Sequence, residues 1–220
     1  METDGGTNIL IDTPPELRLQ LIAAGASRVD AILFTHDHAD HVHGIDDIRA
    51  LSDRNDHPID MYGPPETMER LARRFAYIFD DSIKALPGTS KPEGRAHPVL
   101  PGQIIRIGDV DVLPVAVPHG AATVYGYRIG KLGYITDAKE LTDEAVRAFR
   151  GVTVLVLNAL FRTPHPTHLS VSEAVAAAKK IGARHTWLTH LTHRTGHAEL
   201  EAELPAGIAP AFDGLTVQID

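Results

Sequence analysis

Six consecutive residues carry an unusual density of side chains that bind metals. The run His36-Asp37-His38-Ala39-Asp40-His41 contains three imidazoles and two carboxylates, and it follows the apolar segment Ala31–Phe34, which is typical of a buried strand. Residues two apart in an extended segment face the same way, so the first two histidines can bind one ion while Asp40 and His41 face a second. Crowded imidazoles would repel one another when protonated, which argues against a merely solvated loop. The run therefore predicts a metal site.

Three further candidates, His119, Asp137 and His190, stand at the trailing ends of apolar, strand-like segments. Taken singly, each histidine could be structural, and Asp137 could either cap a turn or bridge two cations. With the three histidines and Asp40 of the first run they supply five histidines and two aspartates. That set is sufficient for two ions that share a bridging carboxylate and a bridging water.

Composition narrows the class of protein. A chain of 220 residues that is 43% hydrophobic and 23% charged predicts a single globular domain, residues 1–220. There is no cysteine, so ligands must be imidazoles and carboxylates, which suit Zn²⁺, Mn²⁺ or Fe²⁺. The net charge of −8 opposes a long nucleic acid as partner but allows a small anion. We find no signal peptide and no membrane-spanning segment, which favours the cytoplasm.

Strand-like segments alternate with helical patterns along the chain, which is typical of a layered α/β protein. The expected strands are Thr7–Asp12, Val29–Thr35, Ile59–Tyr62, Ile104–Ile107, Val110–Val117, Thr123–Ile129, Leu132–Thr136, Val152–Leu157 and His185–Leu188. The expected helices run from a capping box at Thr13–Glu16 to Ala24, from Asp40 to Leu51, and over Pro65–Phe79, Thr142–Phe149 and Val171–Ile181. Asp80–Pro98 is rich in proline and glycine and predicts a long surface loop.

The chain resembles the metallo-β-lactamase superfamily, whose central signature is the His-x-His-x-Asp-His run at His36–His41. Within that superfamily it is most similar to the PhnP-type phosphodiesterases, the phosphoribosyl cyclic phosphate phosphodiesterase group. The motifs that carry this resemblance are Thr35–His41, Gly44–Asp47, Tyr134–Asp137 and Pro164–Ser170. The resemblance covers nearly the whole chain and implies an α/β fold, an αββα sandwich of two mixed sheets flanked by helices.

Family members usually carry an additional glycine-rich strand and turn ahead of the part that aligns with Thr7–Asp12, and this amino-terminal segment is missing here. Its absence would leave one edge of the first sheet exposed or differently paired. Pairing of two copies into a homodimer therefore stays open.

The resemblance also implies a ligand set for two divalent ions, Zn²⁺ or Mn²⁺, with Fe²⁺ also accepted. In this assignment one ion is bound by His36, His38 and His119, the other by Asp40, His41 and His190, and Asp137 bridges the two. We count His168 and Asp40 as the catalytic residues. His168 precedes a capping box at Ser170–Glu173, so it would stand at a helix amino terminus, where an anion is favoured. The family places a histidine here beside the leaving group, which implies a general acid or a phosphate binder.

Several other polar residues have more modest expected roles. Asp12 and Asp37 either orient a ligand imidazole or cap a following turn. His165, which lies between two prolines, is expected to be a rigid loop residue. Three histidines close in sequence to the candidate ligands stay without an assigned role and are expected to support a ligand or to face solvent: His43, His193 and His197.

These features predict a hydrolase of small phosphodiesters, such as cyclic ribose phosphates or nucleotide-like substrates, in which a hydroxide shared by two ions attacks phosphorus in line. Rival hydrolases of the same fold fit less well. Cysteine-liganded β-lactamases need a thiolate, flavin-linked di-iron reductases usually have Glu where His38 stands, and transfer-RNA processing relatives carry a basic arm that is not evident. A non-catalytic metal- or nucleotide-binding protein, or a hydrolase of a non-phosphate ester, stays as an alternative. Selectivity is expected to reside in the Asp80–Pro98 loop.

Overall fold

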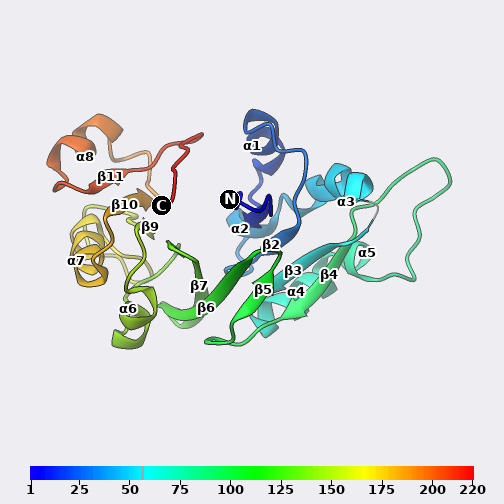
Figure 1. Cartoon of the computed structure of the whole chain (residues 1–220), viewed down its shortest axis with the longest axis horizontal. Coiled ribbons are helices and arrows are strands. Elements are labelled where there is room, and N and C mark those ends of the chain that lie inside the picture. Colours follow the sequence, from blue (N-terminus) through cyan, green and yellow to red (C-terminus); the bar gives the residue numbers. More distant parts are fainter. Residues whose placement is uncertain (56) are drawn as a thin grey trace. The chain divides into compact units, whose positions relative to one another are not determined.

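The chain, whose elements are labelled in Figure 1, divides into two units. Each unit has its own hydrophobic core. The computed structural model describes residues 1–55 and 57–220. Unit 1 comprises Met1–Leu100 and Arg106–Val110, and unit 2 comprises Pro101–Ile105 and Asp111–Asp220. The predicted α/β class, with two sheets flanked by helices, is confirmed.

Unit 1 contains a four-stranded sheet of order β1-β2-β3-β4 whose neighbours pair in parallel. In β3, Ile59, Met61 and Gly63 are buried and alternate with half-buried Asp60 and Tyr62, as the two-residue period of a strand requires. The buried face packs against apolar residues of the helices to form the core. The elements are β1 (Ile9–Ile11), α1 (Leu17–Ala23), β2 (Ala31–Leu33), α2 (Ala39–Val42), the 3₁₀ helix η1 (Ile45–Ile48), α3 (Arg49–Asn55), β3 (Ile59–Gly63), α4 (Pro65–Arg74), α5 (Ala76–Phe79) and β4 (Gly94–Pro98).

The helix expected from Asp40 to Leu51 is interrupted, and the chain forms α2, η1 and α3 instead. The break lies at Gly44, whose backbone N–H donates to the Thr13 carbonyl at 2.9 Å. A Cβ at Gly44 would lie 2.0 Å from the Pro14 carbonyl oxygen, so the two backbones meet where no side chain fits. The tight contact brings the end of the histidine run against the turn that follows β1.

Three other local predictions need correction. The helix expected over Pro65–Phe79 is divided into α4 and α5 at Phe75, which leaves helical geometry with φ −119° and ψ 43°. The capping box at Thr13–Glu16 does not form, because a turn over two prolines precedes α1 and Leu17 N–H donates to the Pro14 carbonyl. The end of the expected Asp80–Pro98 loop is the strand β4, in which Gly94 lets the backbone approach Met61.

Unit 2 holds most of a seven-stranded sheet of order β11-β10-β9-β8-β7-β6-β5. The predicted meander β5 to β8 is confirmed, and β8 to β11 then pair in parallel. The helix α8 and the strand β11 were not predicted, because both are short and show no apolar period. The elements are β5 (Ile105–Ile107), β6 (Val110–His119), β7 (Ala122–Ile129), β8 (Leu132–Ile135), α6 (Asp143–Phe149), β9 (Val154–Asn158), α7 (Val171–Ile181), β10 (His185–Thr189), α8 (His197–Glu203) and β11 (Ile208–Pro210).

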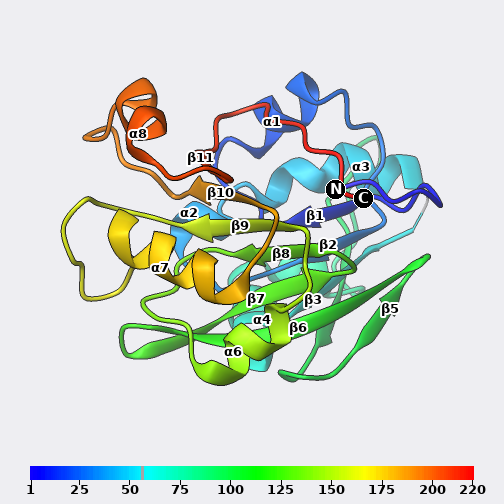
Figure 2. The ribbon, with the colours of Figure 1, turned by 60° about the vertical axis from the view of Figure 1, so that its left-hand side comes forward.

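Helices α6 and α7 pack side by side against this sheet (Figure 2). The predicted capping box of α7 is confirmed: the Ser170 hydroxyl accepts from the Glu173 N–H, and the Glu173 carboxylate accepts from the Ser170 N–H. The helix ends at Gly182, which has the left-handed φ of 78° that glycine adopts at low cost. Both ends of α7 are therefore set by local sequence.

Four strand ends in unit 2 lie at one edge of the sheet. Strands β6 and β8 both run antiparallel to β7, and β9 and β10 run parallel to β8. The register pairs Ile135 with Leu157 and Leu157 with Leu188, so the residues that follow these strands are level with one another. Among the described residues, no helix combines the length and apolar composition that crossing a bilayer requires.

Candidate functional site

The amino-terminal donor set, His36, His38, Asp40 and His41, occupies the loop after β2 and the first turn of α2 in unit 1. The ring centroid of His36 lies 4.4 Å from that of His38 and 4.2 Å from that of His41. The Asp40 carboxylate lies 3.4 Å from His41 Nε2. His36 and His41 are buried, whereas His38 and Asp40 are exposed. Unit 1 thus gathers all four predicted donors in one place.

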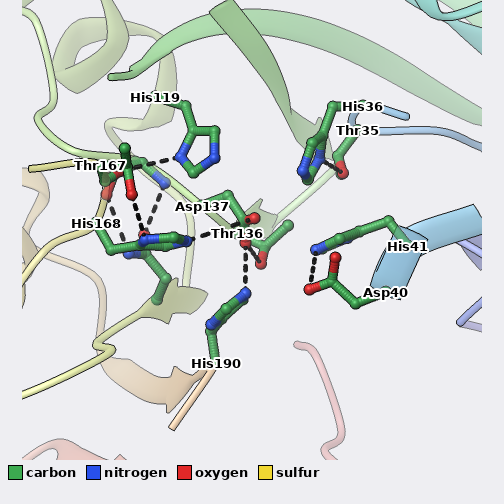
Figure 3. A network of polar contacts seen from close by, with 12 residues as sticks. Thr35, His36, Asp40, His41, His119, Thr136, Asp137, Thr167, His168 and His190 are labelled. Atoms are coloured by element: carbon green, nitrogen blue, oxygen red, sulfur yellow. Dashed lines mark hydrogen bonds and ion pairs between the residues drawn. The ribbon is translucent and has the colours of Figure 1, made fainter. Parts of the chain in front are cut away.

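Asp12 organises this donor set from the end of β1. One of its carboxylate oxygens accepts hydrogen bonds from the Thr35 hydroxyl and from His41 Nδ1, both at 2.7 Å, and the other accepts from the Thr35 N–H at 2.8 Å. The Thr35 hydroxyl proton is committed to Asp12, so the same oxygen accepts from His36 Nδ1–H at 3.0 Å (Figure 3). Of the two roles left open for Asp12, the structure shows the contact with an imidazole, that of His41.

Asp37 has a different partner from the two expected. Its buried carboxylate lies 3.2 Å from the Arg70 guanidinium and 2.9 Å from that of Arg74, and Arg74 also donates to the Asp37 carbonyl. Both arginines belong to α4, so this helix holds the middle of the histidine run through two charge-assisted contacts. No contact with an imidazole is recorded for Asp37 among the described residues, and the sequence offered no signal for the arginines.

The carboxyl-terminal donor set, His119, Asp137, His168 and His190, lies in unit 2 around Asp137. The Asp137 carboxylate accepts from the Thr136 hydroxyl at 2.6 Å and lies 3.1 Å from His190 Nε2 and 3.6 Å from His168 Nε2 (Figure 3). Potential ligand atoms of Asp137, His168 and His190 all lie within 4.8 Å of one another, close enough to hold one ion. Asp137 is 2% exposed, so its charge is largely withdrawn from water.

Thr167 holds two histidines of this set. Its carbonyl accepts from His119 Nδ1–H at 2.9 Å, and its hydroxyl contacts His168 Nδ1 at 2.8 Å. His165 was expected to be a rigid loop residue. Its Nδ1 accepts from the Thr167 N–H, and the centroid of its ring lies 5.3 Å from that of His168. His168 Nε2 is buried and has no hydrogen-bond partner among the described residues.

The hydrogen bonds determine which ring nitrogen of these histidines can bind a cation. In His36, His41 and His119 the Nδ1 proton is donated to an oxygen, so the lone pair of each neutral ring lies on Nε2. Metal-binding histidines in proteins are held in the same way, with one nitrogen on an oxygen acceptor and the other on the ion. The side chains of both donor sets therefore fit divalent cations.

Backbone strain coincides with these residues. In the described part of the chain, non-glycine residues with positive φ are found at three positions: Asp12 at 58°, Asp137 at 63° and His190 at 57°. A left-handed backbone costs a non-glycine residue on the order of 1–3 kcal/mol and persists where the surroundings impose it, often at functional sites. Asp12 and His190 directly follow a strand, and Asp137 lies two residues after the end of β8, so the chain turns sharply where each strand ends.

Asn158, which the sequence analysis did not single out, fixes the turn after Asp137. Its carboxamide oxygen accepts from the Ala138 N–H and its amide nitrogen donates to the Ala138 carbonyl, both at 3.0 Å, and the residue is fully buried. The neighbouring Lys139 donates to Glu173 at 2.9 Å, which ties the same turn to the amino terminus of α7. The sequence carried one signal for Asn158, because it is a polar residue at the end of an apolar strand segment.

Glu173 has a pKa lowered to about 2, mainly because its carboxylate accepts the Ser170 N–H, with further help from Lys139 and the Ser170 hydroxyl.

The other histidines near the candidate ligands take no part in the contacts described for the two donor sets. His43 and His193 are exposed, and the His197 ring lies 6.0 Å from that of Phe212. Among the described contacts, none joins these three residues to either donor set.

A family model described as a beta-lactamase superfamily domain matches residues 7–191. The chain belongs to the β-lactamase superfamily. The solved structure of a new diphosphatase from the PhnP family is 37% identical to it, with a TM-score of 0.87, over 97% of this chain and 80% of that one. These findings confirm the metallo-β-lactamase, PhnP-like group that the motifs indicated, and with it a hydrolase fold that carries His and Asp groups able to bind metal.

Two further relatives differ in the activities that their names state. An octanoyltransferase of Porphyromonas gingivalis is 33% identical over 99% of this chain, but the chain spans 44% of the length of that protein. A ribonuclease Z of Bradyrhizobium sp. is 26% identical over 97% of this chain and 91% of that protein. Superfamily membership therefore does not by itself specify the substrate of this chain.

Proposed function

We propose that this chain is a dinuclear metal-dependent hydrolase of small phosphodiesters. In the proposed assignment, His36, His38 and His119 hold one ion, Asp40, His41 and His190 hold the other, and Asp137 bridges them. The two units then act as one catalytic domain over residues 1–220. The observation that carries the proposal is the set of three imidazoles whose Nδ1 protons are donated to oxygens, which places the lone pair of each neutral ring on Nε2.

Two bound divalent ions, Zn²⁺ or Mn²⁺ with Fe²⁺ as a further candidate, would lower the pKa of a shared water and polarise a phosphate oxygen. The protein's own groups supply the rest. Asp12 accepts the Nδ1 proton of His41 and the Thr167 carbonyl accepts that of His119, which keeps the lone pair of each ring on Nε2. The contacts of Asp37 with α4 hold the loop that carries His36 and His38. Asp40, exposed beside His41, accepts the proton of the attacking water.

His168 protonates the leaving oxygen. Its Nδ1 is held by the Thr167 hydroxyl, and its Nε2 faces Asp137 at 3.6 Å, so a proton on Nε2 would lie beside the candidate bridging carboxylate. The residue precedes the capping box of α7, where backbone N–H groups favour an anion. These contacts support a general acid at this position, and the similarity to a PhnP-family diphosphatase supports a phosphate substrate.

Three alternative functions of the same residues are tested alongside. The octanoyltransferase relative favours an acyl ester or thioester substrate, and the ribonuclease Z relatives favour RNA, although the net charge of −8 opposes a long polyanion. A non-catalytic metal-binding protein is the third. Each predicts a different result with the same reconstituted protein.

The test is elemental analysis followed by a substrate panel. The protein is stripped with a chelator, reconstituted with Zn²⁺, Mn²⁺ or Fe²⁺, and assayed on bis(4-nitrophenyl) phosphate, a cyclic ribose phosphate, an octanoyl thioester and a precursor transfer RNA. We expect two ions per chain and turnover of the small diesters. Reproducible binding of one ion or none would exclude the dinuclear assignment, and turnover of the thioester or RNA alone would exclude the phosphodiesterase assignment.

A further inference from the structure

A row of planar side chains extends from His168 to the surface of unit 2. The His168 ring packs 5.3 Å from that of His165, and the His165 ring packs 5.5 Å from that of Phe161. The guanidinium of Arg194 lies over the Phe161 ring at 5.8 Å from its centroid, within the range of a cation–π contact. Arg194 is exposed, so the row ends at a positive charge in contact with water.

Two arginines lie next to Phe161 but differ in their partners. Arg162 is neutralised by α8, with one guanidinium nitrogen 3.1 Å from Glu199 and another hydrogen-bonded to Glu203. Arg194 makes no ion pair within the described residues, and its planar face is the part that rests on Phe161. Its N–H groups point outward in the plane of the guanidinium, where a carboxylate or phosphate can accept two of them at once.

The position of this cation relative to His168 indicates which part of a substrate would reach it. On the proposed function, His168 protonates the leaving oxygen, with Asp137 on one side of its ring and His165 on the other. Phe161 and Arg194, which lie beyond His165, would then contact the leaving half of the substrate and not the phosphorus that is attacked.

We propose that Arg194, Phe161 and His165 form a subsite for an anionic group on the leaving half of the substrate. This inference rests on the proposed function and narrows its substrate class to phosphodiesters whose leaving group bears a second negative charge. In the reaction, the oxygen of water bonds to phosphorus, the bond from phosphorus to the leaving oxygen breaks, and that oxygen takes a proton. The anionic group on the departing half stays on Arg194 until release.

The kinetic test uses two substrates that differ by one charge. Methyl 4-(carboxymethyl)phenyl phosphate carries a carboxylate on its leaving group, and methyl 4-(carbamoylmethyl)phenyl phosphate carries an uncharged amide of nearly the same shape. In the metal-loaded enzyme, Arg194→Met should lower kcat/KM by about 10–100-fold for the carboxylate substrate, the range for a lost charge-assisted hydrogen bond, and by less than about 3-fold for the amide. Arg194→Lys should recover part of the loss, because it keeps the charge without the planar fork.

Arg162→Met is the matched control, because it removes the neighbouring, ion-paired arginine. It should change kcat/KM for both substrates by the same small factor, since exposed ion pairs contribute little. An equal loss on both substrates in Arg194→Met would overturn the subsite and make Arg194 a structural residue. Unchanged rates on both would overturn it as well.

A binding measurement separates this inference from the proposed function. The leaving product, 4-hydroxyphenylacetate, is titrated into the metal-depleted, isotope-labelled protein, and the Phe161 ring and Arg194 side-chain resonances are followed by NMR. We expect saturable shifts in the natural sequence, none in Arg194→Met and none with the uncharged 4-hydroxyphenylacetamide. Absence of shifts in the natural sequence would overturn the subsite even if diesters are hydrolysed, whereas shifts without hydrolysis would uphold the anion site and reject the phosphodiesterase assignment.

Discussion

At the scale of a single residue, the contacts of His168 fit either a general acid or a metal ligand. Its Nδ1 is held by Thr167, its Nε2 lies 3.6 Å from Asp137, and together with Asp137 and His190 it could hold an ion. The two roles predict opposite results for metal content when the imidazole is removed. A variant without the imidazole, assayed separately for metal content and for kcat, therefore decides between the two roles.

We expect His168→Ala to keep both metal ions and to lose on the order of 10²–10⁴-fold in kcat, the usual contribution of a positioned general acid. The loss should shrink sharply for a 4-nitrophenolate leaving group, which needs little protonation, compared with an alkyl alcohol. Metal content by elemental analysis and kcat on both substrates provide the measurement. Loss of an ion would reassign His168 as a ligand, and equal losses on both substrates would make it a phosphate-positioning residue.

Asn158 acts through the backbone that follows Asp137. Asn158→Ala would leave the buried N–H of Ala138 unpaired, which costs about 1–3 kcal/mol in the free energy of unfolding. The Ala138 carbonyl would still accept from the Leu169 N–H at 2.8 Å. We also expect metal affinity to fall about 10–100-fold, as it does when groups that orient ligands are removed. Competition with a chromophoric chelator measures the affinity.

The matched control for Asn158 is Val146→Ala, which removes buried apolar groups of α6 from the same core. It should lower stability to a similar degree and leave metal affinity unchanged. If both variants weakened metal binding equally, the effect of Asn158 would be one of general stability, and its positioning role would be wrong.

At the scale of a secondary-structure element, the amino terminus of α7 is bound to the turn that follows Asp137. Glu173 closes the capping box, binds Lys139 from the turn after Asp137, and has a pKa lowered to about 2. Because the folded-state pKa is depressed, the carboxylate stabilises the fold above its ordinary pKa of 4.5. That contribution is lost as the pH falls from 4.5 towards 2.

We therefore expect Glu173→Gln to lower the free energy of unfolding by on the order of 1 kcal/mol at neutral pH, the size of a capping interaction. The difference from the natural sequence should be constant between pH 7 and 5.5 and should narrow as the pH is lowered through 4.5. Urea unfolding at a series of pH values measures it. A difference that stays constant down to pH 3 would show that the charge of Glu173 contributes nothing to the cap.

At the scale of the whole molecule, metal ions would link folding to the proposed chemistry. A ligand that binds only the folded state stabilises it by RT ln(1 + [L]/Kd), which is about 2.7 kcal/mol when the free ion is at 100 times Kd. We expect chelation to lower Tm and reconstitution to restore it. Asp137→Ala should abolish both the metal-dependent shift and the activity, because a bridging carboxylate contributes to both ions.

Calorimetry of the apo and reconstituted proteins provides the measurement for Asp137→Ala. The matched control is His43→Ala, an exposed histidine close in sequence to the amino-terminal donor set, which should keep the full metal-dependent shift in Tm. Retention of that shift and of activity in Asp137→Ala would reduce Asp137 to a strand-end residue.

Much of the fold and of the donor chemistry could be predicted from the sequence because the determining interactions are local. A capping box spans four residues, so Ser170–Glu173 fixes the start of α7 wherever that helix packs. Apolar strand segments likewise identify their own ends, which places His119, Asp137 and His190 at strand termini before any contact is known.

The tertiary structure alone decided how those side chains are held, because the partners lie far apart along the chain. Asp12 meets Thr35 across 23 positions, Arg70 meets Asp37 across 33, and Asn158 meets Ala138 across 20. The interruption of the helix at Gly44 has the same origin, since it depends on the approach of the Pro14 backbone. Residue types and local spacing determine which atoms can bind a metal, whereas tautomers, strained turns and clamps arise only when distant segments pack together.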